Sequence, residues 1–364
     1  MKIGTTLLPL HGGKAPYWLF NRMKNLARGI TEVIVSEFGQ LSFLEKIADP
    51  LWFQAFGCVL GFDWHSNGLT TTTCGALKEG LRGIEKELGI YITGGKGRVS
   101  RKTPEEISNW TEKLSINPHP LTYASRLAAK VDNSALQDGY KLYHHVFIFT
   151  KNRSWSVIQQ GMNEDNRYAR RYHWLSTNVS DFVCEPRFAI CCDKKGKTLN
   201  FVSKERSMIR HHTTIVANEN QNSVIKEIKK IKNLHLPKRH YVSIGDINIK
   251  YLYKIPLTTY ENKPTNFENL LGIHGVGPKT IRALSLIAGL IYGSNPSMND
   301  PVRYSFAHGG KYGYPYPVDR SNYDNSIQFL NKCIKQLKIG NSEKIKAFKR
   351  LFTLYKTNNS TNFK

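Results

Sequence analysis

A short segment with two glycines near residue 275 constrains the fold of this chain more than any other part of the sequence. It reads Gly275-Val276-Gly277-Pro278-Lys279-Thr280 and follows the apolar pair Leu270-Leu271. An apolar repeat with helical spacing comes directly after it, at Ile281, Leu284, Ile287, Ala288 and Ile291. Because glycine permits backbone angles with positive φ, the pattern predicts two helices joined by a tight turn.

This turn has the features of an anion-binding site. Gly275 and Gly277 leave backbone N–H groups uncovered, beside the unpaired amides and the positive dipole end of the second helix. In a basic protein, a nucleic-acid phosphate is the expected anion. We therefore expect Gly275, Gly277 and Thr280 to contact DNA phosphate.

The net charge of the chain restricts its partners. Its 52 Lys and Arg residues against 28 Asp and Glu give a formal charge of +24. Each phosphate that a cation neutralises releases condensed counterions, so an excess of this size favours a polyanionic partner. We expect DNA, although charge alone does not exclude RNA. No apolar window approaches the length that spans a bilayer, and no signal-like run begins the chain. We therefore expect a cytoplasmic, nucleoid-associated protein that does not bind membranes.

The cysteines give no sign of a bound cofactor. The six of them have no short repeated spacing, and they stand at positions 58, 74, 184, 191, 192 and 333. Without a CxxC pair, the sequence encodes neither a zinc knuckle nor an iron–sulfur cluster. We expect a reducing compartment and no cofactor, and nothing in the sequence sets the oligomeric state.

Hydrophobic periodicity predicts an α+β fold with three regions. These are a helical, loop-rich region at residues 1–135, a small antiparallel sheet within residues 136–245, and a helical region at 246–364 that contains the glycine turn. Helices are expected at residues 18–38, 42–48, 224–234, 323–337 and 342–354, the first ending at Gly39. Strands are expected at residues 143–150, 154–160, 182–184 and 188–192, and the first two form a hairpin.

Two other basic segments suit contact with nucleic acid. The glycine-rich run at 94–102 predicts a flexible loop that contacts phosphate through Lys96, Arg98, Arg101 and Lys102, or else a solvated loop. The run from Arg167 to Trp174 interleaves cations with aromatic rings, which suits base stacking beside phosphate contacts. The alternative for this second run is a solvated basic face with its aromatic side chains turned inward.

The segment Gly61-Phe62-Asp63-Trp64-His65-Ser66 is a candidate base-binding loop. Gly68, the threonine run at 70–73 and Gly75 predict irregular structure around it. An aromatic face beside hydrogen-bonding groups suits a flipped base, so we expect Asp63, Trp64 and His65 to contact substrate. The alternative is a structural loop whose tryptophan fills a gap in the core.

Metal binding has little support in the sequence. His144-His145 and His211-His212 lack a carboxylate at ligand-like spacing, so we expect no metal site. Asp193 and Lys195, with Glu185 nearby, weakly resemble the signature of metal-dependent nucleases. An exposed turn is the favoured interpretation of those residues.

Nearly the whole chain is similar to an uncharacterised archaeal and bacterial family, number 763 in the domain-of-unknown-function series. The resemblance rests on long strings, at residues 8–16, 61–66, 304–311 and 317–320. The family implies no activity, so function has to be inferred from the glycine turn and the residues around it.

That turn resembles the helix-hairpin-helix element of the helix-hairpin-helix DNA glycosylases. In bifunctional members of that superfamily, the position matching Lys279 is the amine nucleophile, and Val318-Asp319 fits the pair that supplies the catalytic carboxylate. The resemblance thus implies a DNA glycosylase with AP lyase activity that uses Lys279 and Asp319. The aromatic, glycine-rich loop at 303–317 leads to Asp319, and we expect its His308 to contact substrate.

Three functions remain open at this point. Lys279 either attacks the sugar of a damaged nucleotide or only contacts phosphate. A metal-dependent nuclease would instead use carboxylates of the middle region and a divalent cation. A non-enzymatic nucleic-acid-binding protein would bind DNA without forming a product.

Overall fold

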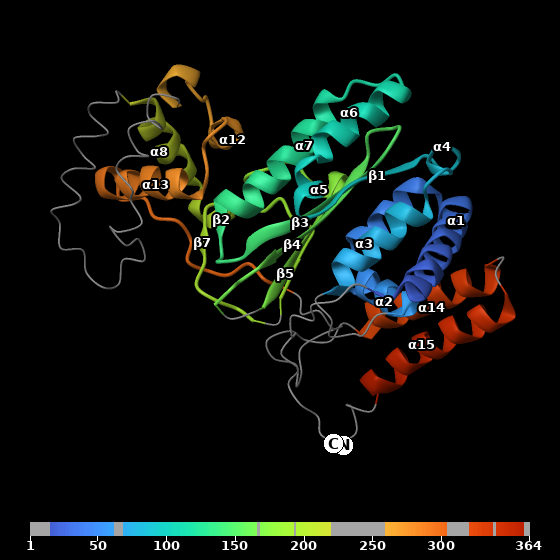
Figure 1. Cartoon of the computed structure of the whole chain (residues 1–364). Helices are drawn as coiled ribbons and strands as arrows, with labels where there is room; N and C mark the ends of the chain where they lie inside the picture. The colour runs from blue at the N-terminus through green and yellow to red at the C-terminus, as the bar shows by residue number, and fades with distance from the viewer. Residues whose placement is uncertain are drawn as a thin grey trace.

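An antiparallel sheet of five strands forms the centre of the molecule (Figure 1). The computed structural model describes residues 15–61, 68–165, 168–192, 194–219, 259–303, 320–337 and 340–359. The strands, in their hydrogen-bonded order, are β1 (Ile90–Lys96), β3 (Lys141–Thr150), β4 (Trp155–Met162), β5 (Ala169–Leu175) and β6 (Ala189–Cys191). A separate pair joins β2 (Leu136–Gln137) to β7 (Leu199–Asn200).

The hairpin between β3 and β4 confirms the prediction from the local sequence. Both strands are rich in aromatic and β-branched residues, which fit a buried pleated surface. They are joined at Lys151-Asn152-Arg153, where Arg153 adopts a left-handed φ of 65° and its N–H donates to the carbonyl of Thr150 at 3.0 Å. The short strand β6 likewise confirms the strand expected at 188–192.

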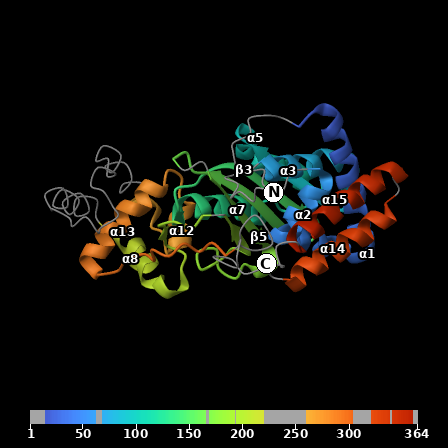
Figure 2. The same ribbon diagram turned by 90° about the horizontal axis from the view of Figure 1, so that it is seen from below.

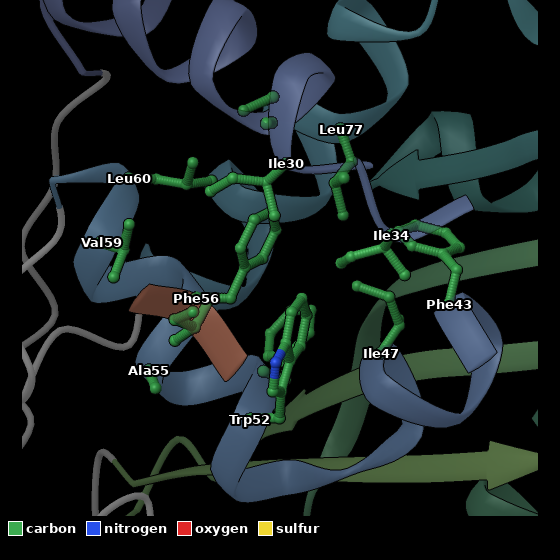
Figure 3. Close-up of a cluster of buried hydrophobic side chains, with 14 of the residues drawn as sticks. Ile30, Ile34, Phe43, Ile47, Trp52, Ala55, Phe56, Val59, Leu60 and Leu77 are labelled. Carbon is green, nitrogen blue, oxygen red and sulfur yellow. The ribbon is translucent and has the colours of Figure 1, made fainter. Parts of the chain in front are cut away.

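Helices from both ends of the chain cover one face of the sheet (Figures 1 and 2). They are α1 (Tyr17–Ala48), α2 (Pro50–Leu60), α3 (Gly68–Gly80), α14 (Arg320–Gln336) and α15 (Asn341–Asn359). Their apolar side chains meet Val146 and Ile148 of β3 in one cluster. Figure 3 shows the centre of this cluster, where Trp52 stacks on Phe56 with ring centroids 4.9 Å apart.

Local sequence signals explain how these helices begin and end. Gly39 has φ 82° and ψ 170° and interrupts α1, which confirms the stop predicted there. The Asp49 carboxylate then caps α2 by accepting hydrogen bonds from the amides of Leu51 at 2.8 Å and Trp52 at 2.9 Å. Pro50 occupies the first turn, where its missing N–H costs nothing.

The opposite face of the sheet is covered by α6 (Thr103–Lys113) and α7 (His119–Lys130), which continues as one π-helical turn, Val131–Ala135. Side chains alternate between faces along a strand, so Phe147 and Phe149 of β3 point into this second cluster. The same cluster includes apolar residues of α8 (Ser207–Asn218), α12 (Phe267–Gly272) and α13 (Pro278–Tyr292). The remaining short helices are α4 (Glu85–Leu88), α5 (Arg98–Arg101) and the 3₁₀ turns Ser176–Asn178 and Lys204–Arg206.

The expected combination of helices with a small antiparallel sheet is confirmed, but several local predictions were wrong. The threonine run and Gly75 belong to helix α3, which packs against α1 and β1 and buries Thr70 and Thr73. Residues 182–184 form a turn instead of a strand, and residues 207–218 form helix α8 inside the span predicted as sheet. The predicted helix at 224–234 lies outside the described residues.

Strand β1 and helices α14 and α15 pack against elements from other predicted regions of the chain. β1, from the predicted helical region, is the edge strand of the sheet and pairs with β3 along its whole length. Helices α14 and α15 pack against α1 and α2, whereas α12 and α13 pack against α7 and α8. The three-region division stays a prediction, and its boundary at residue 245 lies outside the described residues.

Candidate nucleic-acid interface

Helices α12 and α13 are joined by the turn formed by residues 273–277. Gly275 has a φ of 86°, a conformation that favours glycine, and no atom lies within 4 Å of the position that a Cβ would take. Gly277 has an extended backbone with a φ of −137°, so of the two glycines only Gly275 uses the positive φ that glycine permits. Val276 between them is buried and packs into the second core cluster. The turn therefore has one apolar side facing the core and one open side at the glycines.

The open side of the turn meets the N-terminus of α13. Pro278 is the first residue of this helix and has no N–H, and the amide of Ile281 is bonded to the carbonyl of Gly277 at 3.0 Å. The amides of Lys279 and Thr280 lie before that first helical bond, where helix geometry supplies no acceptor. Lys279 is exposed, whereas Thr280 is buried and its Oγ1 accepts from the Gly277 amide at 3.5 Å. The exposed cation and the two amides suit a phosphate oxygen.

Two side chains from the neighbouring segment fix the position of the turn. The Lys130 ammonium donates to the carbonyls of Val276 and, at 3.4 Å, of Ile273. Gln137 donates through Nε2 to the carbonyl of Pro278 at 2.9 Å and accepts from Arg282 Nε at 2.9 Å. Burial lowers the pKa of Lys130. These contacts tie the turn to the π-helical end of α7, so it is presented as a fixed surface.

The basic segment at 96–102 forms the edge of the sheet and a short helix, so the prediction of a flexible loop was wrong. Residues 94–96 belong to β1, and Gly97 anchors the segment because its amide donates to the Tyr143 carbonyl at 2.7 Å. The α5 turn follows directly. All four cations predicted to contact phosphate are exposed, at Lys96, Arg98, Arg101 and Lys102.

The glycine turn and the basic segment lie towards the same end of the sheet. Gln137 contacts the glycine turn at Pro278, and Tyr143 contacts the basic segment at Gly97. These two residues are six positions apart in the sequence. Six extended residues span at most about 20 Å. Gln137 and Tyr143, which anchor the two sites, therefore lie no more than about 20 Å apart.

Five of the predicted site residues lie outside the described residues. They are the candidate catalytic residue Asp319 and the candidate substrate-binding residues Asp63, Trp64, His65 and His308. Their roles stay predictions. Thr70, in the first turns of α3 just after that candidate base-binding loop, contacts Arg171 Nη1 at 3.3 Å.

Residues 169–174 of the basic and aromatic run at 167–174 are buried, so both interpretations of its surface were wrong. Residues 169–175 form strand β5 inside the sheet, and Arg170, Arg171, Tyr172, His173 and Trp174 are each at most 1% exposed. Arg170 binds Asp138 and Asp300 on one face of the strand. On the other face, Arg171 donates to Gln54, Thr70 and the carbonyl of Pro50. These cations therefore hold the core together and do not contact a partner.

The register of the sheet places five polar side chains in one line, here called the polar row. Paired positions run from β1 to β6 through Lys96, His144, Gln160, Arg171 and Cys191. Directly paired residues on antiparallel strands share a face. The row lies at one end of the face that α2 and α3 cover. Sequence inspection missed it because the register joins residues up to 95 positions apart, from Lys96 to Cys191.

A second buried network crosses the other face of the sheet. His145 contacts Ser125 Oγ through Nε2 and Gln159 Oε1 through Nδ1, both at 2.9 Å. Gln159 donates to Asp132, which also accepts from Trp174 Nε1 at 2.7 Å and from Arg187. Burial raises the pKa of Asp132 to about 6, although Arg187 and Trp174 oppose the shift.

The buried histidines predict that the protein loses stability in mild acid. Burial lowers the pKa of His144 to about 3, of His145 to about 4, and of His173 well below its usual value, while all three return to about 6.5 on unfolding. The unfolded chain thus binds more protons below pH 6.5, and from pH 7 to pH 5 each histidine costs about 2 kcal/mol of stability. Asp132 opposes this by about 1 kcal/mol, because its raised pKa favours protonation in the folded state.

Thermal unfolding at pH 7 and pH 5 measures this balance. The melting temperature is expected to fall at pH 5, and His144→Phe is expected to reduce the fall by removing one of the titrating groups. Equal melting temperatures at both pH values in the parent protein would contradict the lowered pKa values of the buried histidines.

The described residues contain no group of three or more His, Cys, Asp or Glu side chains placed to hold a metal ion. His211 and His212 lie on α8, where His212 stacks on Tyr292 with ring centroids 4.4 Å apart. Glu185 accepts a hydrogen bond from the amide of Lys204 at 3.3 Å, and Asp193 lies outside the described residues. No helix in the described segments is long and apolar enough to cross a membrane.

Comparison with known proteins places the chain in a family. Residues 4–318 match DUF763, whose description is a protein of unknown function. The match covers most of the chain, and the protein belongs to this family. No curated protein and no solved structure matches the sequence significantly.

Proposed function

We propose that this protein binds DNA through phosphate contacts at the glycine turn. The observation that carries the proposal is the exposed Lys279 beside two helix-terminal amides, on a turn that Lys130 and Gln137 hold in place. A helix N-terminus and a lysine both favour negative charge. The turn between α12 and α13 supports the resemblance to helix-hairpin-helix elements.

The exposed cations of the basic segment extend this proposed contact surface. Lys96, Arg98, Arg101 and Lys102 add four positive charges towards the same end of the sheet. The whole-chain charge of +24 agrees with a polyanionic partner. Contacts of this kind recognise the backbone and carry no direct sequence information.

A DNA glycosylase with AP lyase activity is the enzymatic form of this proposal. The specific observation in its favour is that no carboxylate among the described residues forms an ion pair with Lys279, whose amine is exposed. In this mechanism Asp319 takes a proton from the Lys279 ammonium, and the amine attacks C1′ of the damaged nucleotide as the bond from C1′ to the base breaks and the base leaves with a proton. Opening of the C1′–O4′ bond, with Asp319 stabilising the cationic sugar, then gives the Schiff base. Loss of a C2′ proton and of the 3′ phosphate completes β-elimination.

Borohydride trapping on DNA with an abasic site tests the enzymatic form. The lyase predicts a covalent adduct that persists in chelator and disappears in both Lys279→Ala and Lys279→Arg. Because arginine keeps the positive charge, Lys279→Arg is expected to retain DNA affinity within about twofold. The arginine variant therefore separates a nucleophile from a phosphate contact.

The other outcomes identify the alternatives. Binding that is retained in Lys279→Arg, without an adduct in the parent protein, would leave a non-enzymatic DNA-binding protein. Cleavage that requires a divalent cation and forms no adduct would indicate a nuclease.

A further inference from the structure

His144, the second member of the polar row, is a buried side chain that the fold does not satisfy. It is 1% exposed, and neither of its ring nitrogens has a hydrogen-bond partner among the described protein atoms. Buried polar groups in folded proteins are normally paired, because burial removes their bonds to water. The histidine on the next position, His145, makes two hydrogen bonds and shows the usual arrangement.

Hydrogen-bond donors gather around His144 at the open edge of the sheet. Lys96 is its direct partner on β1, so the two Cβ atoms are about 5 Å apart on the same face. Tyr143 forms a bulge beside it, and its hydroxyl oxygen accepts from Gln160 Nε2, which leaves the hydroxyl proton to be donated elsewhere. The Lys96 ammonium lies 5.8 Å from the Tyr143 ring centroid.

Glu106, a carboxylate that contacts β1 at this edge, is already paired with a cation. Glu106 accepts from Lys78 Nζ at 2.6 Å and from the Gly94 amide at 2.9 Å. Lys96 is exposed and Tyr143 is half-buried, so two polar side chains beside His144 reach the surface. Burial, then His145 and Lys96, lower the pKa of His144, so its neutral ring offers one donor and one acceptor.

We propose that Lys96, Tyr143 and His144 form a binding site for a phosphoryl group at the β1 edge of the sheet. The Lys96 ammonium, the Tyr143 hydroxyl and the His144 ring N–H would each donate to a phosphate oxygen. The second ring nitrogen of His144 would accept from a protonated phosphate oxygen. The exposed Arg98, two positions beyond Lys96, adds positive charge at the entrance. The group is either free phosphate or the terminal phosphate of an oligonucleotide, and only the second source rests on the proposed DNA binding.

Titration of the full chain with inorganic phosphate tests this site. The probe is the set of histidine ring signals in proton–nitrogen NMR, with sodium chloride at matched ionic strength as the reference and His144→Gln to assign the His144 ring. Phosphate is expected to shift the His144 signals saturably. Calorimetry is expected to show at least about tenfold weaker phosphate binding in Lys96→Gln and His144→Phe. Lys113→Gln, an exposed lysine on α6, is the matched control and is expected to bind like the parent.

Folding and ligand source are controlled separately. If His144→Phe does not fold, Lys96→Gln carries the test, because its side chain is exposed. Tighter binding of a 5′-phosphorylated oligonucleotide than of its 5′-hydroxyl form, with the difference lost in Lys96→Gln, would indicate a DNA end. Equal binding of the two forms would indicate free phosphate. The proposal is overturned if chloride produces the same shifts, or if phosphate affinity is unchanged in both variants.

The phosphate-binding test and the test of DNA binding at Lys279 can fail independently of each other. Loss of DNA binding in Lys279→Ala leaves phosphate binding at Lys96 intact in this account. Absence of phosphate binding would remove the β1 site and leave the glycine turn untouched.

Discussion

Replacing Arg170 with methionine is expected to lower the free energy of unfolding by about 3–5 kcal/mol. The change leaves two buried carboxylates, Asp138 and Asp300, without the guanidinium that joins them. Arg170 Nη1 lies 3.0 Å from Asp138 and Nη2 lies 2.7 Å from Asp300, and the three side chains are at most 4% exposed. Their desolvation would be uncompensated in the variant.

The setting of Arg170 explains why methionine cannot substitute for it. Desolvation would lower the pKa of Arg170, but Asp138, Tyr172 and Asp300 raise it, so the side chain stays charged. The guanidinium also stacks over Tyr140, with its carbon 4.3 Å from the ring centroid. Asp300 stands 130 positions after Arg170, so the pair connects the end of the segment after α13 to the sheet.

Urea unfolding of the two proteins measures the effect. Arg82→Gln is the control, because Arg82 pairs with Glu79 on the surface with 71% of its side chain exposed, and its loss is expected to cost less than about 1 kcal/mol. Similar losses in the two variants would show that the buried pair contributes no more than a surface one.

Gly94→Ala is expected to cost about 2–5 kcal/mol, from backbone strain together with a steric clash. Gly94 has a φ of 85°, and an added Cβ would lie 2.2 Å from the His145 carbonyl oxygen and 2.6 Å from Thr103 Oγ1. Backbone on the partner strand cannot move aside without breaking the pairing of β1 and β3. The expected result is a loosened β1 edge.

Gly83→Ala separates the clash from the strain. Gly83 has a similar φ of 91°, but no atom lies within 4 Å of its Cβ position. Its replacement is expected to cost only about 1–2 kcal/mol of backbone strain. Denaturant midpoints of the two variants give the comparison. If Gly94→Ala is no less stable than Gly83→Ala, the result would contradict the close packing of Gly94 in β1 against the backbone of β3.

Features encoded by neighbouring residues were predictable from the sequence. Gly39 ends a helix because it adopts a left-handed conformation, and Lys151-Asn152-Arg153 joins two strands whose composition marks them. The two helices around Gly275 follow from the glycine turn and the apolar repeat after it. Each of these depends on contacts or backbone angles within a few residues.

The role of β5 was not predictable, because its partners are distant in the sequence. Arg170 and Arg171 suggested a surface that contacts nucleic acid, yet both are buried. Their partners Asp138, Asp300 and Gln54 lie 32, 130 and 117 positions away. The same limit applies to His144, whose importance becomes visible only when the strand register places it beside Lys96.

The central claim is that the glycine turn contacts DNA phosphate through Lys279. Lys279 is exposed in the first turn of α13, where its amide and that of Thr280 also lie, and Gly275 just before it has open space at its Cβ position. A phosphate contact of this kind contributes to affinity through counterion release, so it leaves a defined dependence on salt. The size of that dependence distinguishes it from a general effect on folding.

The most direct test is the affinity of the full chain for a duplex of about 20 base pairs, measured across a range of salt concentrations. Each phosphate contact contributes about 0.9 to the slope of log affinity against log salt. We expect Lys279→Ala to bind more weakly and to reduce the slope by about that amount, while Lys113→Gln behaves like the parent. A parent protein that does not bind the duplex, or a slope and affinity unchanged in Lys279→Ala, would contradict the account.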